Sequence, residues 1–99
     1  MPVRIIAIKI LRDFWKKHND AEQPLKAWYA EAKRANREKP PDIIKLYRTA
    51  SVLPNNRIVF NIKGNDYRLV TAINYDFGII YIRFIGTHKE YDKINAEEI

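Results

Sequence analysis

Residues 57–86 read RIVFNIKGNDYRLVTAINYDFGIIYIRFIG, and their alternating apolar pattern is typical of β-strands. Gly64-Asn65 forms a favourable two-residue hairpin turn, and Asp76-Phe77-Gly78 supplies a second turn signal. Because each turn reverses the chain, this stretch predicts three antiparallel strands joined by short loops. The expected strands are residues 57–63, 66–75 and 79–86.

Turn chemistry also predicts the register of these strands, with the second loop centred on Phe77-Gly78. The expected pairs are Lys63 with Asp66, Asn61 with Arg68, Val59 with Val70, Asn74 with Tyr81, Ala72 with Arg83, and Arg68 with Thr87. Since side chains alternate, one face should form a core wall for helices. It comprises Ile58, Phe60, Ile62, Leu69, Thr71, Ile73, Ile80, Ile82 and Phe84. The other, uncovered face is cationic and collects Asn61, Lys63, Arg68, Val70, Asn74, Tyr81, Arg83 and Ile85.

The first half of the chain is predicted to be mainly helical after a short strand from Val3 to Ile8. Two apolar stripes follow at helical spacing, and Pro24 suits the first turn of the second helix. We expect these helices to form an antiparallel pair. The stripes consist of Ile10, Leu11, Phe14, Trp15 and His18, and of Leu25, Trp28, Tyr29 and Ala32.

The remaining segments carry weaker signals. Residues from Asp42 to Arg48 favour a short third helix after the Pro40-Pro41 pair, whereas residues 51–56 are typical of a loop. After the last strand, a short helical segment is expected from Lys89, and the chain is expected to fray from Asn95.

Composition indicates a soluble globular protein with a single domain over residues 1–99. Hydrophobic residues make up 46% of the chain and charged residues 30%, which excludes a disordered tail. The absence of cysteine excludes a disulfide scaffold and thiolate chemistry. Because the sequence contains neither a signal-type start nor an apolar run of membrane length, we expect a cytoplasmic protein without a membrane partner.

The net charge of +6 is distributed unevenly along the chain. Residues 1–50 hold 12 Lys and Arg against 6 Asp and Glu, whereas residues 51–99 hold 6 of each. The excess positive charge therefore lies in the predicted helical half. It is either an ordinary solvated surface or a footprint that attracts the phosphate backbone of RNA or a ribosome.

The end of the last predicted strand gathers groups that can act on a phosphate ester. An imidazole such as that of His88 can take and give a proton near neutral pH, and a helical turn would place Tyr91 beside it. Arg68 and Arg83 share the uncovered face, roughly 13 Å apart along the strands, and guanidinium groups bind phosphate oxygens in pairs. Taken singly, each residue has a simpler interpretation as a solvated arginine, a surface histidine or a packed tyrosine.

Metal and nucleotide-cofactor sites are not favoured. The chain has only two histidines, no cysteine, no carboxylate cluster at ligand spacing and no glycine-rich phosphate loop. We therefore expect no metal and no cofactor. Metal-free RNA cleavage fits the remaining residues, because the ribose 2′-oxygen is the nucleophile and the protein aligns groups, transfers protons and stabilises charge. Tyr81 or Tyr91 could stack on an unpaired base.

Two stretches, RIVFNIKGNDYRL at residues 57–69 and YIRFIGTHKEYDK at residues 81–93, closely resemble the HigB-type mRNA interferases, which are RelE-like toxins of type II toxin–antitoxin modules. The Phe14-Trp15 helix, the Ala27-Trp28 helix and residues 42–52 resemble them as well. The resemblance therefore covers nearly the whole chain.

The resemblance implies a RelE-like α+β fold, in which an N-terminal strand and two antiparallel helices pack on a small twisted antiparallel sheet. It implies mRNA cleavage, usually on the translating ribosome, and neutralisation by a cognate HigA-type helix-turn-helix antitoxin. Carried onto this sequence, it implies a catalytic site of Arg68, Arg83, His88 and Tyr91. The RNA contacts beside it would be Asn61, Lys63, Tyr81 and Lys89. The division of acid and base roles between His88 and Tyr91 stays open.

Two other functions fit the same residues. A non-catalytic RNA-binding or ribosome-binding protein could block translation by occupancy, and the same positive charge would serve it. A purely structural partner subunit is the third alternative. The non-catalytic binder predicts translation arrest without new mRNA 5′ ends, whereas the structural subunit predicts no effect on growth.

Overall fold

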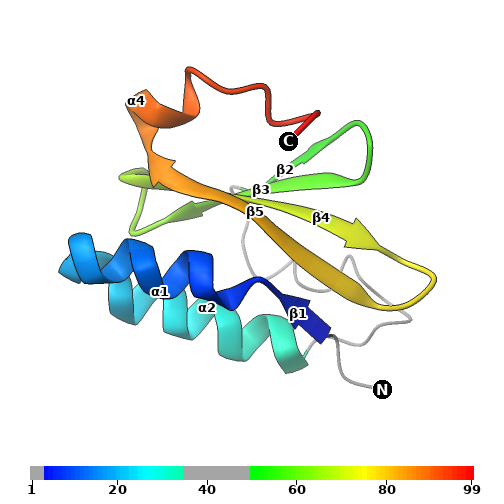
Figure 1. Ribbon diagram of the computed structural model, residues 1–99, viewed down its shortest axis with the longest axis horizontal. Helices are drawn as coiled ribbons and strands as arrows, with labels where there is room; N and C mark the ends of the chain where they lie inside the picture. Colours follow the sequence, from blue (N-terminus) through cyan, green and yellow to red (C-terminus); the bar gives the residue numbers. More distant parts are fainter. Residues whose placement is uncertain (1–3, 35–49) are drawn as a thin grey trace.

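A sheet with the strand order β1-β5-β4-β3-β2 organises the computed structural model, which describes residues 4–34 and 50–99. Helices α1 and α2 cover one face of this sheet, and α4 lies on the opposite side, which we call the outer face (Figure 1). The elements in chain order are β1 (Arg4–Ile6), α1 (Ile8–Lys17), the 3-10 turn η1 (Asn19–Ala21), α2 (Glu22–Arg34), β2 (Ser51–Leu53), β3 (Arg57–Ile62), β4 (Tyr67–Asn74), β5 (Ile79–Thr87) and α4 (His88–Tyr91).

The sheet is mixed, which corrects the expectation of a purely antiparallel sheet. Strand β1 runs parallel to β5, with Arg4 paired to Ile79, while the other neighbouring strands are antiparallel. No hairpin joins β1 to β5, so no turn forces them to run in opposite directions. Residues expected to form only a loop supply the edge strand β2, which turns into β3 through Asn55 and Asn56, both at positive φ.

Helices α1 and α2 form the expected antiparallel pair and run in opposite directions beneath the sheet (Figure 1). Their predicted apolar stripes supply the buried residues Leu11, Leu25, Trp28 and Ala32, and Pro24 lies in the first turn of α2. The predicted third helix at residues 42–48 lies outside the described residues. Within residues 4–34 and 50–99, no helix has the length and apolar character needed to cross a membrane.

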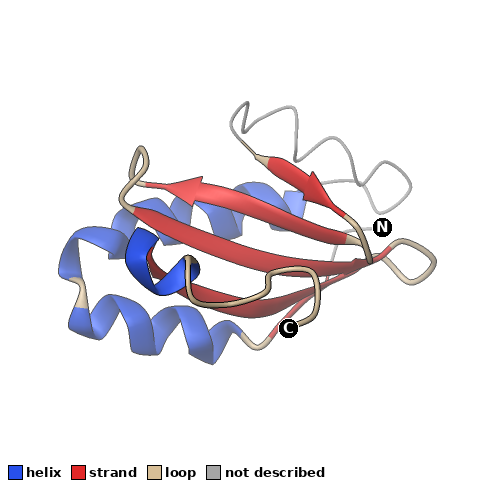
Figure 2. Cartoon of the chain, turned by 90° about the horizontal axis from the view of Figure 1, so that it is seen from above, coloured by secondary structure: helices blue, strands red, loops and turns tan. Residues whose placement is uncertain are grey.

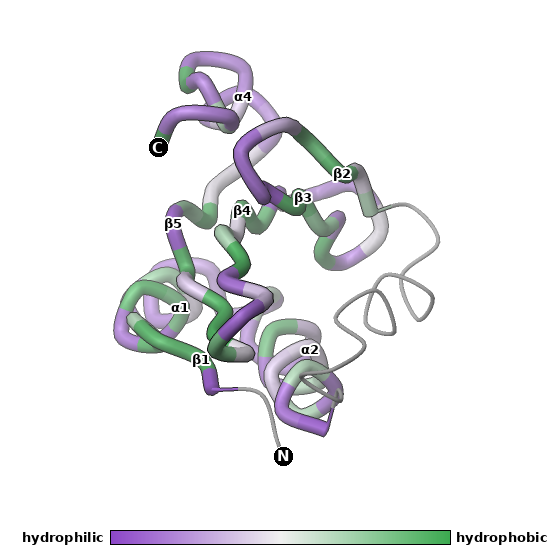
Figure 3. Tube along the Cα trace, turned by 90° about the vertical axis from the view of Figure 1, so that its right-hand side faces the viewer, coloured by the Kyte–Doolittle hydropathy of each residue, from purple (hydrophilic) through white to green (hydrophobic). Residues whose placement is uncertain are grey.

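Two layers of apolar side chains meet between the helix pair and the sheet. Trp28 and Phe60 are fully buried there, and their rings meet edge to face with centroids 5.4 Å apart. In Figure 3, hydrophobic stretches recur along the strands, whereas α4 is mostly hydrophilic. The buried cluster on the helix side comprises Leu11, Ala21, Leu25, Trp28, Ala32, Ile58, Phe60, Ile62, Tyr67, Leu69, Ile73, Ile80, Ile82 and Ile85.

The β3–β4 register is as predicted, with Asn61 opposite Arg68, but the turn between β4 and β5 differs. The expected pairs Asn74–Tyr81 and Ala72–Arg83 are replaced by Asn74–Ile79 and Ala72–Tyr81. The loop spans residues 75–78 and is centred on Asp76-Phe77 instead of Phe77-Gly78, and within it the Asn74 side chain accepts a hydrogen bond from the Phe77 N–H at 3.1 Å. A shift of two residues keeps every side chain on its expected face, since side chains alternate with a period of two.

A β-bulge in the middle of the β4–β5 pair adds a second, one-residue shift. Val70 pairs with Phe84 and Thr71 with Ile82, so Arg83 is the extra residue of the bulge. A bulge sharpens the local twist and can re-aim a side chain. It also divides β5 into two parts with different registers.

Beyond the bulge, two side chains exchange faces relative to the prediction. Phe84, which was expected in the core, packs on the outer face, and Ile85 is buried with the helix-side cluster. Arg68 pairs with Gly86 instead of Thr87. The alternation of apolar residues continued through the bulge in the sequence, so the pattern gave no sign of the exchange.

Gly86 is expected to be required for the packing of Phe84. A β-carbon at Gly86 would lie 2.5 Å from the Phe84 Cζ atom and 3.2 Å from the Glu90 Cβ atom. Gly86→Ala should therefore cost about 1–2 kcal/mol in unfolding free energy, because the ring must leave its cluster. Denaturant unfolding of Gly86→Ala, Phe84→Leu and the double variant measures this. The double variant should lose less unfolding free energy than the two single variants together. Strictly additive losses would contradict the contact between residue 86 and the Phe84 ring.

The C-terminal segment, residues 92–99, lies across the outer face (Figure 2). Ala96 is only 7% exposed and packs with Val59 and Val70. The Arg57 guanidinium donates to the main-chain oxygen of Ile99 from Nε at 3.0 Å and from Nη2 at 2.7 Å. The expectations of fraying from Asn95 and of an uncovered outer face are therefore wrong, because apolar residues of the C-terminal segment pack on the outer face of β3 and β4.

Candidate functional site

Arg68 lies at the start of β4, between Asn61 of β3 and Gly86 of β5. Its side chain is half-buried, and Nη1 donates to the main-chain oxygen of Asn65 at 3.0 Å. This bond holds the guanidinium toward the β3–β4 turn and leaves further N–H groups for an anion. An arginine has five N–H donors, so one bond to the backbone does not exhaust it.

His88 opens α4 directly after the end of β5, and a capping box fixes that junction. The Thr87 hydroxyl accepts from the Glu90 N–H at 3.3 Å, while the Glu90 carboxylate accepts from the Thr87 N–H at 2.8 Å. The bond from the Thr87 backbone is the main reason that the pKa of Glu90 is lowered. The His88 side chain is exposed, and its Nδ1 lies 3.3 Å from an oxygen of Asp92. A carboxylate in that position can orient an imidazole.

Tyr91 lies three residues after His88 and is half-buried on the outer face. Its ring packs against the small cluster formed by Val59, Val70 and Ala96. From the sequence, a packing role for Tyr91 was an open alternative, and the structure shows that its ring does pack. The ring is thereby held in place at the same end of the sheet as His88.

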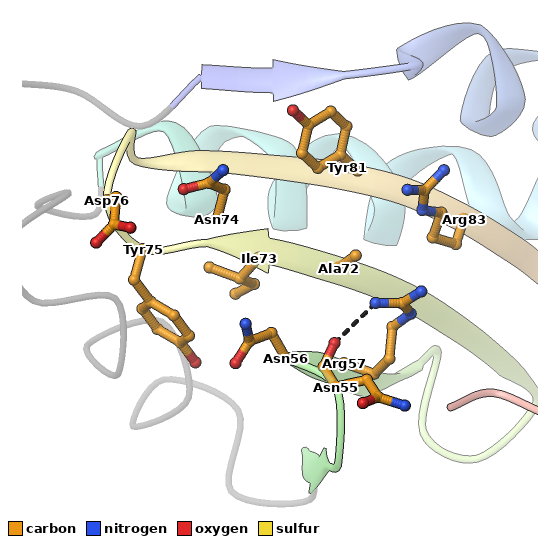
Figure 4. Close-up of a pocket in the computed structure, with 10 residues that line it drawn as sticks. All are labelled: Asn55, Asn56, Arg57, Ala72, Ile73, Asn74, Tyr75, Asp76, Tyr81 and Arg83. Carbon is orange, nitrogen blue, oxygen red and sulfur yellow. Dashed lines mark hydrogen bonds between the residues drawn. The ribbon is translucent and has the colours of Figure 1, made fainter. Parts of the chain in front are cut away.

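Arg83 lines an open cleft of about 460 Å³ on the outer face (Figure 4). Arg57 of β3 pairs with Ala72 of β4, which pairs with Tyr81 of β5. Arg57 and Arg83 lie on either side of the small Ala72 side chain, and the Arg83 guanidinium lies 5.3 Å from the centre of the Tyr81 ring. The cleft is lined by Asn55, Asn56, Arg57, Ala72, Ile73, Asn74, Tyr75, Asp76, Tyr81 and Arg83.

The four expected RNA contacts have different surroundings. Tyr81 is half-buried in the cleft, and Lys89 is exposed on α4. Asn61 is half-buried beside Arg68 on the neighbouring strand. Lys63 is exposed but engaged, because its Nζ lies 2.6 Å from an oxygen of Asp20. Of these four residues, Tyr81 is the one that lines the cleft.

Asp20 joins the helix pair to the β3–β4 turn. Its carboxylate accepts from Lys63 Nζ and from the Tyr67 hydroxyl, each at 2.6 Å. The bonds from Lys63 and then Tyr67 lower the pKa of Asp20, while the bond to Asp20 raises the pKa of both Lys63 and Tyr67. The cluster therefore favours ionised Asp20, protonated Lys63 and protonated Tyr67, which are the forms that these groups hold near neutral pH.

Stability should depend on pH through this cluster. The contribution of ionised Asp20 is present above about pH 4, the ordinary range of an aspartate, and is lost as pH falls through the lowered folded-state pKa. Asp20→Asn should lower the melting temperature by about 3 °C at neutral pH and by much less near pH 2. Thermal unfolding at both pH values measures this.

The matched control for Asp20 is Glu22→Gln, which breaks the exposed Lys26–Glu22 pair at the same 2.6 Å distance. That pair is local to one helix turn and lacks a tyrosine partner, so its loss should change the melting temperature less. If Asp20→Asn lowered the melting temperature equally at neutral pH and near pH 2, the link between stability and the ionisation of Asp20 would be contradicted.

The structure brings some of the expected catalytic residues to the same end of the sheet but does not place all four in one cleft. Arg68, His88 and Tyr91 belong to the end where β4 begins and β5 finishes. Arg83 shares its cleft with Arg57, which sequence reasoning missed. Within the described residues, no hydrogen bond or ion pair links two of the four side chains. The alternation that put Asn61 on the outer face would have placed Arg57 there too.

Comparisons with known proteins agree on one family. Residues 21–94 match the HigB_toxin family model, described as the RelE-like toxic component of a toxin–antitoxin system. The mRNA interferase toxin HigB of Escherichia coli (strain K12) is 27% identical over 96 residues, covering 95% of this chain and 92% of that protein. The mRNA interferases HigB of Escherichia coli O157:H7 and of Shigella flexneri give the same values.

Proposed function

The chain belongs to the HigB family of RelE-like toxins, and we propose that it is an endoribonuclease that cleaves mRNA as the toxin of a type II toxin–antitoxin module. The observation that carries this proposal is the family match over residues 21–94, joined to relatives that are named mRNA interferases. We treat residues 1–99 as one toxin domain that acts in the cytoplasm. The cationic groups of the outer face supply the chemistry.

The proposed reaction needs no metal, because the RNA carries its own nucleophile. The ribose 2′-oxygen forms a bond to the adjacent phosphorus as the bond to the 5′-oxygen of the next nucleotide breaks. One protein group takes the 2′-hydroxyl proton and another protonates the departing 5′-oxygen. The products are a 2′,3′-cyclic phosphate and a 5′-hydroxyl. Charge that accumulates on the phosphate oxygens must be stabilised by fixed donors.

The end of the sheet at which β5 passes into α4 supports this assignment. Arg68 of β4 lies opposite Gly86 of β5, two residues before His88, so a guanidinium from β4 and an imidazole from the start of α4 belong to the same end of the sheet. The capping box fixes the start of α4 and thereby the backbone of His88. His88 transfers protons, Arg68 stabilises the phosphate, and Tyr91 assists from the next turn of α4. Which of His88 and Tyr91 is the base is left open.

Arg83 is the second guanidinium of the proposed site. The bulge places it beside the pairs of Val70 and Thr71, two to three residues along β4 from Arg68 and so roughly 8 Å away. Two arginines at this spacing can contact neighbouring phosphates of one RNA strand. Tyr81, Lys89, Asn61 and Lys63 would contact the RNA beside the scissile phosphate.

The partners follow from the same proposal. The translating ribosome presents the mRNA, and the positive helical half of the chain is attracted to ribosomal RNA. A cognate HigA-type helix-turn-helix antitoxin neutralises the toxin. It should present acidic or apolar surface that masks Arg68 or Arg83, or block entry to the ribosome. A complex that leaves both the outer face and ribosome entry open would contradict this.

Brief induction in bacterial cells tests the proposed function. We expect growth arrest together with new mRNA 5′ ends that end sequencing detects within minutes. Co-expression of a helix-turn-helix protein encoded beside the gene should remove both effects. Growth arrest without new 5′ ends would instead favour a non-catalytic translation inhibitor.

A further inference from the structure

We propose that the cleft between Arg57 and Arg83 is a binding subsite for one nucleotide of single-stranded RNA, with its phosphate on the arginines and its base in the cleft. The proposal rests on the proposed function in taking RNA as the ligand. It goes further by assigning a separate surface and residues to recognition of a base. Four features of the cleft support it.

The first feature is a pair of arginines. Arg83 is exposed, rests on the Tyr81 ring at 5.3 Å, and has no hydrogen bond or ion pair to residues 4–34 or 50–99. Arg57 is held by its bonds to Ile99 and by a 2.7 Å bond from Nη1 to the main-chain oxygen of Asn55. The acceptors are main-chain oxygens, which hold the Arg57 guanidinium in place beside the cleft. The two guanidinium groups can attract a phosphate, and the carboxylate that also lines the cleft, that of Asp76, lies away from them beside Tyr75 (Figure 4).

The second feature is the shape of the cleft. The residue between the two arginines is Ala72, whose small side chain is only 6% exposed and forms part of the floor. The volume of about 460 Å³ lies within the range of about 300–1,000 Å³ that is usual for small-molecule sites. A single nucleotide falls in this size class, whereas an RNA duplex is too large for a cleft of this volume.

The third feature is a set of amide groups on the rim. Asn74 uses its side-chain oxygen to accept from the Phe77 N–H, which leaves its amide N–H groups free to donate. Asn56 comes from the opposite hairpin turn and is held at a φ of 58°. Both residues line the cleft (Figure 4). Amide side chains can form paired hydrogen bonds with the edge of an unpaired base.

The fourth feature is aromatic surface. Tyr75 is 38% exposed in the turn after β4 and lines the cleft beside Asn56 (Figure 4). Unpaired bases stack on such rings, and each stacked base strengthens binding about 5-fold or more. A tyrosine and two asparagines beside two arginines match the components of a nucleotide: base face, base edge and phosphate.

The position of the cleft separates recognition from chemistry. Arg83 is shared by both surfaces, while Asn56, Asn74 and Tyr75 lie at the end of the sheet opposite to His88. An RNA strand bound along β5 would place one nucleotide in the cleft while a phosphate a few nucleotides further along the strand reacts at His88. The cleft would then contribute to which sequences are cleaved.

NMR titration of the wild-type protein with the four nucleoside 5′-monophosphates tests the subsite. These ligands lack the bond that would be cleaved, so the result does not depend on catalysis. We expect resonances of the Asn56 and Asn74 side-chain amides and of the Tyr75 ring to shift, with one base bound more tightly than the others. Asn74→Asp should weaken binding about tenfold or more, because it adds negative charge yet keeps the oxygen that accepts from Phe77.

Asn95→Asp is the matched control, because its side-chain oxygen accepts from the Glu97 N–H at 3.1 Å in the same manner, outside the cleft. It should bind nucleotides like the wild type. Equal weakening by both variants would overturn the proposal, as would equal shifts with inorganic phosphate or ribose 5-phosphate. Nucleotide binding without mRNA cleavage in cells would reject the proposed function alone. Cleavage without nucleotide binding in the cleft would reject the subsite alone.

Discussion

Replacing His88 by glutamine should reduce mRNA cleavage by about 10²–10⁴-fold, which is the usual contribution of a positioned acid or base. Glutamine keeps the size and hydrogen-bonding ability of the side chain but cannot transfer a proton. His88 is exposed at the start of α4, and α4 is held by the Thr87–Glu90 capping box, which the substitution leaves in place. The fold should therefore be retained, and cells should tolerate induction of the variant.

Single-turnover cleavage of a reporter mRNA on purified ribosomes measures the effect of His88→Gln. His18→Gln is the matched control, because it removes the other histidine of the chain from the helix side of the sheet. His18 stacks on Phe14 at 4.4 Å, so its loss should affect stability slightly and cleavage little. Full activity of His88→Gln, or an equal loss in both variants, would reject the assigned role.

Trp28→Ala should destabilise the fold by about 3–5 kcal/mol, a large part of the 5–15 kcal/mol that is typical of a small domain. Trp28 is fully buried and meets the Phe60 ring edge to face, so truncation leaves a cavity between α2 and the sheet. Equilibrium denaturant unfolding measures the loss. The variant should be largely unfolded at 37 °C if the parent stability lies near the lower limit.

Trp28→Phe separates the packing of this ring from its polar group. The Trp28 Nε1 atom is buried, and no acceptor among the described residues contacts it. Phenylalanine removes that donor and retains most of the apolar ring, so the two effects should partly cancel. We expect Trp28→Phe to lose about 1 kcal/mol of unfolding free energy. A loss as large as that of Trp28→Ala would contradict the interpretation that the Trp28 N–H is an unsatisfied buried donor.

Much of the fold could be predicted from local patterns. The apolar stripes predicted α1 and α2, and the turn at Gly64-Asn65 predicted the β3–β4 register, because each signal lies within a few residues. The resemblance at residues 57–69 and 81–93 predicted the family, which the match over residues 21–94 confirms. The α+β class is confirmed as well, with a mixed sheet in place of the expected antiparallel one.

The errors arose where distant residues determine the structure. The bulge at Arg83 depends on how two strands pair across a turn, and alternation along one strand cannot reveal it. The parallel pairing of β1 joins residues far apart in the sequence, so no local signal sets its direction.

The C-terminal segment shows the same limit for the candidate site. Its apolar residues Ile94, Ala96 and Ile99 are too sparse to predict an element, yet they pack on a surface that β3 and β4 provide. Arg57 was missed as a component of the outer face for a simpler reason. It is the first residue of β3, at the end of the sheet opposite to His88, where no histidine in the sequence marks a site.

The most direct test of the proposed chemistry replaces a single ribose in the substrate. A reporter mRNA carrying one 2′-deoxynucleotide immediately before a mapped cleavage site is bound to ribosomes and treated with the purified protein. Without the 2′-oxygen the nucleophile is absent, so that site should stay intact while unmodified sites are cut and yield 2′,3′-cyclic phosphate ends. Cleavage at the deoxy position at an undiminished rate would contradict the proposed reaction.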